Sequence, residues 1–382
     1  MRVSKLAKVA SIALAFGLVA TTPAHAANLS GSGASFPANL IEACKAPFAN
    51  ASGHSYTYAS SGSSTGRGNS DKSIGDFWFT DGAHVGSSRR ASIIHVPAVA
   101  APIAIMHNLP GKKTLQLSAD TIAKIFSGQI TMWNDPAIVA DNNRTIQQVK
   151  YRTNADGTLK KNAQGDPEVL SSRPVKRNYV LPAKKIQVVV RSDGSGTTEN
   201  FTNFLNKSAS SVWTRPKASV FKDSFPGDIN APGNLGRIVG AQSSTGVGLQ
   251  ASKTPYSITY NEVNYAKTYN LKVADVINPA GTAVAPDATG TSAFLASATQ
   301  DANGFLTFDY ATKEKGAYTL GIVSYMLVDT NYADKEKAKA VKELAEFILS
   351  PKCALDAGEN LGFALITGDF LKKSLAQVAK IK

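Results

Sequence analysis

The sequence has few of the residues on which metal sites and most hydrolytic sites depend. It contains two cysteines and five histidines in 382 residues, and neither type occurs in the close pairs typical of zinc sites. No histidine follows His107. The chain also lacks the G-x-x-x-x-G-K-[ST] motif that binds nucleotide phosphates. These absences argue against a metal, any other cofactor and nucleotide hydrolysis.

Apolar runs of about 18 residues, long enough to span a membrane as a helix, are also missing. The first 26 residues carry Arg2, Lys5 and Lys8, then a short apolar run at 12–20 and a small-x-small site at 24–26. This pattern is typical of a secretory signal peptide cut after Ala26, and it predicts export to the periplasm. The alternative is an N-terminal helix of the fold. The mature protein is expected to be soluble.

Length and charge limit the remaining possibilities. Without the first 26 of its 382 residues the chain has 356, which predicts two domains. Its net charge of +13 falls to +10, because the leader carries three basic residues and no acidic one. Lysines and arginines are scattered, without a basic run or an RNA-binding signature, so nucleic acid is not the predicted partner. A basic surface instead favours an anionic ligand.

One stretch, residues 188–205, combines a β-branched run with a glycine-rich turn and a helical pattern. The apolar run at 188–190 favours a buried strand, the chain breaks at Asp193-Gly194, and apolar residues return at helical spacing. Ser195 and Thr197 are candidate N-caps. A helix start leaves backbone N–H groups unpaired and carries partial positive charge, so this corner can hold an anion.

Arg191 strengthens that interpretation, because its planar guanidinium can hold an oxyanion through two parallel hydrogen bonds. Asp193 could fix the arginine or face the ligand itself. An ordinary strand–turn–helix corner is the alternative. Two earlier segments, 30–41 and 60–66, are also rich in glycine and hydroxyl residues. If the three corners converge in space, they predict a site for a small tetrahedral anion.

The motifs in these segments resemble those of a known family. They are Gly33-Ala-Ser35-Phe36-Pro37, Gly62-Ser63-Ser64, Asp76-Phe-Trp-Phe-Thr-Asp81 and Arg191-Ser-Asp193-Gly194-Ser195-Gly196-Thr197. Their order is similar to that in the phosphate-binding periplasmic proteins of ABC transporters. Segments 117–135 and 255–260 extend the likeness over most of the mature chain. The Arg-x-Asp-Gly-Ser-Gly-Thr element is the most specific part.

The resemblance implies an α/β fold of two lobes, joined by two hinge crossings, with the ligand in the interdomain cleft. Alternating strand and helix patterns independently favour an α/β fold. The expected division is domain I at 27–105 and 319–382, and domain II at 106–318. Residues 142–184 look like a basic insertion, longer than the family's usual connection. A solvated loop is the default expectation there, with turn signals at 154–157 and 164–167 that suit a hairpin tip.

The resemblance also assigns roles to particular residues. Asp81 is expected to accept a hydrogen bond from a protonated oxygen of phosphate and to repel sulfate, which carries no proton. As a simpler alternative, Asp81 is a turn residue and Ser63 a helix cap. Asp193 is expected to support the arginine. The implied phosphate donors are Ser35, Phe36 and Ser63 in domain I and Arg191, Ser195, Gly196 and Thr197 in domain II.

Two further features follow from the family pattern. The family builds its first domain from both ends of the chain, which implies a structural disulfide between Cys44 and Cys353. Trp78 and Phe79, in contrast, stand where the family usually has small residues. They either pack behind the site or narrow it and change its selectivity.

Three further functions are compatible with parts of the sequence. Gly62-Ser-Ser64-Thr-Gly66 fits the G-x-S-x-G nucleophile pattern of a serine hydrolase, but a hydrolase of that type has its histidine late in the chain. The second is a sulfate-binding protein, and the third is a surface-interaction protein that uses the basic insertion. The favoured prediction is a monomeric, non-enzymatic protein that captures inorganic phosphate and delivers it to the membrane permease subunits of an ABC transporter.

The pattern of apolar residues also predicts individual elements. Residues 98–106 and 318–328 are apolar and strand-like. The resemblance implies that these two strands form the crossings between domains. Ser118 is expected to cap a helix whose Ile122, Ile125 and Phe126 share a face. A second amphipathic helix is expected at 338–348, with Pro351 shortly after its end.

Overall fold

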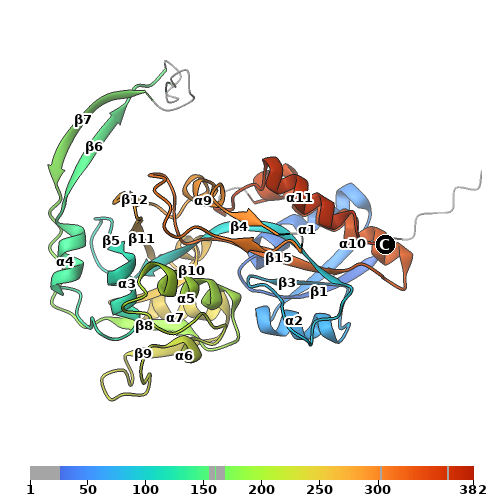
Figure 1. The fold of residues 1–382 in the computed structure, drawn as a ribbon, viewed down its shortest axis with the longest axis horizontal. Coiled ribbons are helices and arrows are strands. Elements are labelled where there is room, and N and C mark those ends of the chain that lie inside the picture. Colours follow the sequence, from blue (N-terminus) through green and yellow to red (C-terminus); the bar gives the residue numbers. More distant parts are fainter. Residues whose placement is uncertain (1–25, 155–159, 161–167, 302, 359–360) are drawn as a thin grey trace, which may run out of the picture.

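The computed structural model describes residues 26–154, 160, 168–301, 303–358 and 361–382, which form a mixed α/β fold. The predicted signal segment, apart from Ala26, lies outside the described residues. An 11-stranded sheet extends through the length of the molecule (Figure 1). Along its main path the strands are β2 (Ser55–Ser60), β1 (Asn28–Gly33), β3 (Phe77–Thr80), β15 (Gly321–Asp329), β4 (Ile93–His107), β10 (Ser257–Glu262), β8 (Gln187–Arg191) and β9 (Ile238–Ala241).

Strand β4 belongs to both halves of this sheet. Its residues from Ile93 to Pro102 pair with β15, and those from Ile103 to His107 pair with β10. The register between β4 and β15 shifts after Ser324, so that Ala98 opposes no residue of β15. The change of partner supports the domain division near residue 105, which we retain as a proposal. We call the part around β1, β2, β3 and β15 the first lobe and the part around β8, β9 and β10 the second lobe.

Three short strands extend the sheet in the second lobe. These are β11 (Lys272–Ile277), which pairs with β4, and β5 (Gln116–Ser118) and β12 (Ala283–Val284), which pair with β11. The pair β13 (Thr299–Gln300) and β14 (Leu306–Thr307) forms a separate small sheet.

Helices pack on both lobes, and both ends of the chain build the first (blue and red in Figure 1). The first lobe holds α1 (Ala38–Ser52), α2 (Ser63–Asp71), α10 (Lys335–Ile348), the π-helical turn η1 (Lys352–Ala357) and α11 (Gly368–Val378). The second lobe holds α3 (Ala119–Phe126), α4 (Pro136–Asn142), α5 (Gly196–Ser208), α6 (Phe221–Ser224), α7 (Ser243–Lys253) and α8 (Asn264–Thr268), and α9 (Ala288–Leu295) packs against β15 and β4.

A disulfide joins the two ends of the chain within the first lobe. Cys44 on α1 is bonded to Cys353 in η1 across 309 positions, with a Cα–Cα distance of 5.2 Å. Both residues are fully buried. A bond that closes so long a loop restricts the unfolded chain, so its role is structural.

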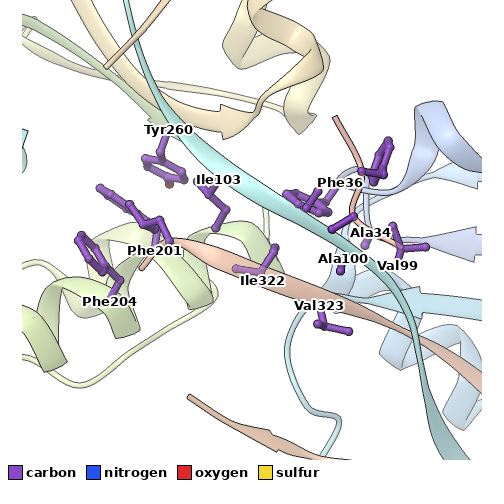
Figure 2. Packing of buried hydrophobic residues seen from close by; sticks show 14 of the residues in the cluster. Ala34, Phe36, Val99, Ala100, Ile103, Phe201, Phe204, Tyr260, Ile322 and Val323 are labelled. Atoms are coloured by element: carbon purple, nitrogen blue, oxygen red, sulfur yellow. The ribbon is translucent and has the colours of Figure 1, made fainter. Parts of the chain in front are cut away.

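Apolar side chains cover β4 and β15 where these strands pass from one lobe to the other (Figure 2). Phe201 of α5 stacks on Tyr260 of β10 with ring centroids 4.1 Å apart. On the other side, Phe36 is fully buried in the same cluster. The core therefore reaches the start of α5 and the end of β1, and it fixes the positions of the corners that follow those strands.

The predicted insertion is a β ribbon, and the default expectation of a solvated loop was wrong for its stem. Strands β6 (Thr145–Tyr151) and β7 (Val169–Lys176) pair antiparallel in a sheet of their own that stands away from the body (Figure 1). Alternating polar residues hid the β-branched pattern of β6. The predicted turns, apart from Asn154, lie outside the described residues.

The other predicted elements are confirmed. Residues 98–106 lie in β4, most of 318–328 in β15, and 338–348 in α10. Ser118 caps α3 by accepting a hydrogen bond from the backbone N–H of Thr121. Among the described residues, no helix combines the length and apolar character needed to cross a membrane.

Candidate functional site

The predicted ligand residues end or follow parallel strands. Strand β1 is parallel to β2 and β3 in the first lobe, and β8 is parallel to β9 and β10 in the second. Chain segments that leave the carboxyl ends of these strands meet between the lobes. Ligands of open α/β sheets characteristically bind beyond the carboxyl ends of strands. The topology therefore places the predicted corners together.

The corner between β8 and α5 is a capped helix start, as its sequence predicts. Ser195 is the N-cap, and its Oγ accepts a hydrogen bond from Thr198 N at 3.1 Å. In the described part of the chain, no hydrogen bond takes up the backbone N–H of Gly196 or Thr197. These two groups, with the partial positive charge of the helix start, can donate to an anion.

Arg191 is held rigidly at this corner. Its side chain is 2% exposed, its Nε donates to Asp193 Oδ1 at 2.7 Å, and Nη2 pairs with Oδ2 of the same carboxylate. Asp193 Oδ1 also accepts from Ser243 N at 3.0 Å. Burial disfavours the charged carboxylate, but the bonds to Arg191 outweigh it and lower the pKa of Asp193. Asp193 thus fixes the guanidinium and leaves Nη1, whose contact to Ser244 Oγ is 3.5 Å long, for a ligand.

Asp81 lies buried at the seam between the lobes, 3% exposed. Its Oδ1 accepts from Ser324 Oγ at 2.7 Å, and its Oδ2 from Thr197 Oγ1 at 3.3 Å and Ser63 Oγ at 3.4 Å. Burial raises the pKa of Asp81 to about 6, while Ser324 and the charge of Arg191 limit the rise. Near neutral pH the group is a carboxylate that can accept but not donate a hydrogen bond.

Helix α5 approaches this carboxylate very closely, because it begins with glycine. A Cβ at Gly196 would lie 2.5 Å from Ser63 Oγ and 2.7 Å from Asp81 Cβ. The second lobe is therefore packed directly against two of the predicted ligand residues of the first lobe. The structure has the geometry of a closed protein.

A second contact across the seam joins Ser35 to Ser244. The two Oγ atoms are 2.9 Å apart, and Ser35 Oγ accepts from Ser244 N at 3.2 Å. Both residues are buried. Phe36, in contrast, packs its ring into the core, so only its backbone can face the site.

The structure thus brings the predicted ligand residues of the two lobes together. Ser35, Ser63 and Asp81 come from the first lobe, and Arg191, Ser195, Gly196 and Thr197 from the second. Ser195 acts as a helix cap, and its own N–H donates to Ser219 O at 2.9 Å. The Ser195 hydroxyl can therefore donate a hydrogen bond to a ligand, whereas the Ser195 backbone N–H cannot.

Sequence reasoning missed two residues of the site, Ser244 and Ser324. Ser244 lies in the first turn of α7, in the tetrapeptide Ser243-Ser-Thr-Gly246. The same tetrapeptide, Ser63-Ser-Thr-Gly66, starts α2. This repetition is a signal that would have found Ser244. Ser324 lies within an apolar strand and carries no local signal.

Trp78 and Phe79 pack behind the site and do not narrow it. The Trp78 indole donates to Ile74 O at 2.6 Å and lies in a small cluster with Ile93 and Leu327. Phe79 is fully buried, with its ring edge-on to Tyr58 at 5.8 Å. Both side chains belong to the core of the first lobe.

The geometry does not favour a catalytic serine or a metal site among the described residues. The Ser64 hydroxyl lies within 3.5 Å of Ser219 Oγ and 3.4 Å of Arg67 Nη2, and no histidine contacts it in the described part of the chain. Within the same residues, no group of three His, Cys, Asp or Glu side chains is arranged to hold a metal ion. The site combines many donors with one accepting carboxylate, which suits a protonated oxyanion.

Comparison with known proteins agrees with this geometry. The chain is 32% identical over 256 residues to phosphate-binding protein PstS 3 of Mycobacterium tuberculosis, covering 65% of this chain and 56% of that protein. It is 30% identical over 270 residues to the phosphate-binding protein PstS of Methanocaldococcus jannaschii, covering 67% and 60%. The chain thus matches little more than half the length of these curated relatives.

Solved structures share the fold. A high-affinity periplasmic phosphate-binding protein bound with phosphate superposes with a TM-score of 0.62 at 20% identity, over 91% of this chain and 93% of that one. The phosphate-binding protein from Stenotrophomonas maltophilia gives 0.58 at 18% identity over the same shares. The model of the PBP superfamily domain matches residues 18–352. The chain belongs to the PBP superfamily.

Proposed function

We propose that this protein captures inorganic phosphate between its lobes and delivers it to an ABC transporter for import. The observation that carries the proposal is the pairing of one buried carboxylate, Asp81, with hydroxyl, backbone and guanidinium donors. Phosphate near neutral pH both accepts hydrogen bonds and keeps one or two protons to donate. The names of the curated relatives support the same ligand.

Sulfate is the closest competitor for such a site. It offers acceptors to the same donors but has no proton for Asp81, so it would meet the carboxylate as an unpaired buried charge. Sites that require a hydrogen bond from the ligand discriminate strongly against analogues that cannot make it. We therefore propose that Asp81 selects for phosphate.

The proposed function also requires export of the protein and docking on a transporter in the membrane. Export by the N-terminal signal, with cleavage after Ala26, would bring a monomeric protein to the periplasm. There it would dock on the membrane permease subunits of the transporter, and a separate subunit would consume ATP. The chain itself needs no cofactor for this role and carries out no covalent chemistry.

Thermal unfolding with each anion tests the proposal. At one hundred times its Kd, phosphate should stabilise the mature protein by about 2.7 kcal/mol, and sulfate at matched ionic strength should not. The shift should be lost in Arg191→Ala and Asp81→Ala. A shift with sulfate alone would make the protein a sulfate-binding member of the superfamily. No shift with either anion would refute an oxyanion site.

A further inference from the structure

The carboxylate of Glu199 forms one ion pair with a cationic side chain of each lobe. This residue lies in the first turn of α5 and is buried. Its Oε1 accepts from Lys217 Nζ at 2.7 Å, within the second lobe. Its Oε2 accepts from Arg67 Nη1 at 3.1 Å, and Arg67 belongs to α2 of the first lobe. The Arg67–Glu199 pair therefore exists only while the lobes are together.

The Glu199 carboxylate packs against Gly82 of the first lobe, a residue without a side chain. A Cβ at Gly82 would lie 2.3 Å from Glu199 Oε2, so the carboxylate rests against bare backbone immediately after Asp81. Next to it, Asn200 Nδ2 donates to Asp81 O at 2.6 Å, across the same seam. The two lobes thus pack closely beside the predicted ligand residues. Among the described residues, Arg67–Glu199 is the only ion pair that joins the two lobes.

Burial makes this pair stronger than an ordinary surface ion pair. Exposed pairs contribute little because water screens them, whereas the side chains of Arg67 and Glu199 are 16% and 12% exposed. Lys217 stays with Glu199 when the lobes separate, so opening does not leave the carboxylate without a partner. At Glu199, opening therefore breaks only the bond to Arg67, and the carboxylate keeps its partner Lys217.

We propose that Arg67 and Glu199 form a latch that sets the lifetime of the closed, anion-bound state without touching the anion. Both are positioning residues. The latch rests on the proposed function, because it acts on the closure of the lobes around the ligand. It predicts that Arg67 controls the rate of anion release, while Lys217, which holds the same carboxylate from within one lobe, does not.

Two variants with the same change in net charge test the latch, Arg67→Gln and Lys217→Gln. Stopped-flow measurements with inorganic phosphate give the association and dissociation rates. In Arg67→Gln the dissociation rate and Kd should rise about tenfold while the association rate stays within about twofold. In Lys217→Gln the dissociation rate should stay the same or fall. Equal increases in both variants, or none in Arg67→Gln, would overturn the latch.

Three controls separate the latch from folding and from the proposed function. The melting temperature without ligand should be similar for all variants, and Arg67→Lys, which keeps the charge, should release phosphate at an intermediate rate. Small-angle scattering without ligand should give a larger radius of gyration for Arg67→Gln than for Lys217→Gln. If the wild type binds neither phosphate nor sulfate, the proposed function fails. Equal radii of gyration would then overturn the latch as well.

Discussion

Ser324 Oγ donates to Asp81 Oδ1 at 2.7 Å, although 243 positions separate the two residues. The other oxygen of the carboxylate holds only the longer contacts to Thr197 and Ser63, at 3.3 and 3.4 Å. One oxygen of Asp81 is thus firmly committed inside the protein, and the other remains the better acceptor for a ligand proton.

Selectivity between phosphate and sulfate should depend on pH. Burial raises the pKa of Asp81 to about 6, so above this pH the group is ionised and repels sulfate. As the pH falls through 6, Asp81 takes up a proton and can donate to sulfate. Calorimetric titration should therefore find sulfate binding about tenfold tighter near pH ~5 than near pH ~7.5. Asp81→Asn should bind sulfate with little pH dependence, and rejection of sulfate by this variant would contradict the role of Asp81.

A methyl group at position 196 should prevent full closure. In Gly196→Ala the new Cβ would lie 2.5 Å from Ser63 Oγ, which forces α5 away from the first lobe. The Kd for phosphate should rise at least about tenfold. Gly68→Ala is the matched control, because a Cβ at this α2 position meets nothing within 4 Å. Similar Kd values for the two variants would show that close approach at Gly196 is unimportant.

Glu262 should make the ligand-free protein less stable at high pH. It is fully buried at the end of β10, and in the described chain neither carboxyl oxygen has a hydrogen-bond partner. Burial, then the charge of Asp81, raises the pKa of Glu262 well above its ordinary 4.5. The folded state therefore keeps a proton that the unfolded chain has released, and the free energy of unfolding falls as the pH rises above 4.5.

The variant Glu262→Gln removes this dependence. Its free energy of unfolding should match that of the wild type near pH ~4 and exceed it near pH ~8, by about 1.4 kcal/mol for each unit by which the pKa is raised. Denaturant unfolding at the two pH values measures the difference. A variant that is less stable than the wild type at both would mean that the carboxyl has a partner that glutamine cannot replace.

The β6–β7 ribbon should be dispensable for anion binding. Thr145 and Lys176 are paired at its base, so a two-residue Asn-Gly turn can replace residues 146–175. Phosphate Kd should stay within about twofold of the wild type, because the ribbon forms a sheet separate from the strands that carry the site. A large loss of affinity would contradict this separation. If the variant lost permease binding but kept phosphate binding, the basic insertion would be a contact site for the permease.

Much of the site was predictable because its parts are short and local. Residues 191–197 contain, within a few positions, a glycine-rich turn after a strand, a hydroxyl N-cap and an arginine. Their convergence follows from parallel strands ending on one side. The fold class followed from the alternation of strand and helix patterns and from the family resemblance. The apolar runs predicted the strands β4 and β15, and the resemblance alone implied that they cross between the lobes.

The remaining features depend on contacts between distant segments. Ser324 is one polar residue in an apolar strand, and only the pairing of β15 with β3 and β4 brings it to Asp81. Likewise, nothing near Arg67 or Glu199 in the sequence indicates that they meet. The β ribbon was missed because its strands pair only with each other and β7 is mostly exposed, so the apolar alternation that identifies core strands is weak there.

The shifted register between β4 and β15 has a consequence for how the protein can change. Ala98 opposes no residue of β15, and the shift falls next to Ser324. Side chains on a strand alternate between faces, so a slip of one residue exchanges the faces completely. Substitutions in these crossings would alter packing locally. Losing or gaining one residue near Ala98 would turn the side chains of β4 beyond that point to the opposite face of the sheet, so the length of this strand is under tighter constraint than its composition.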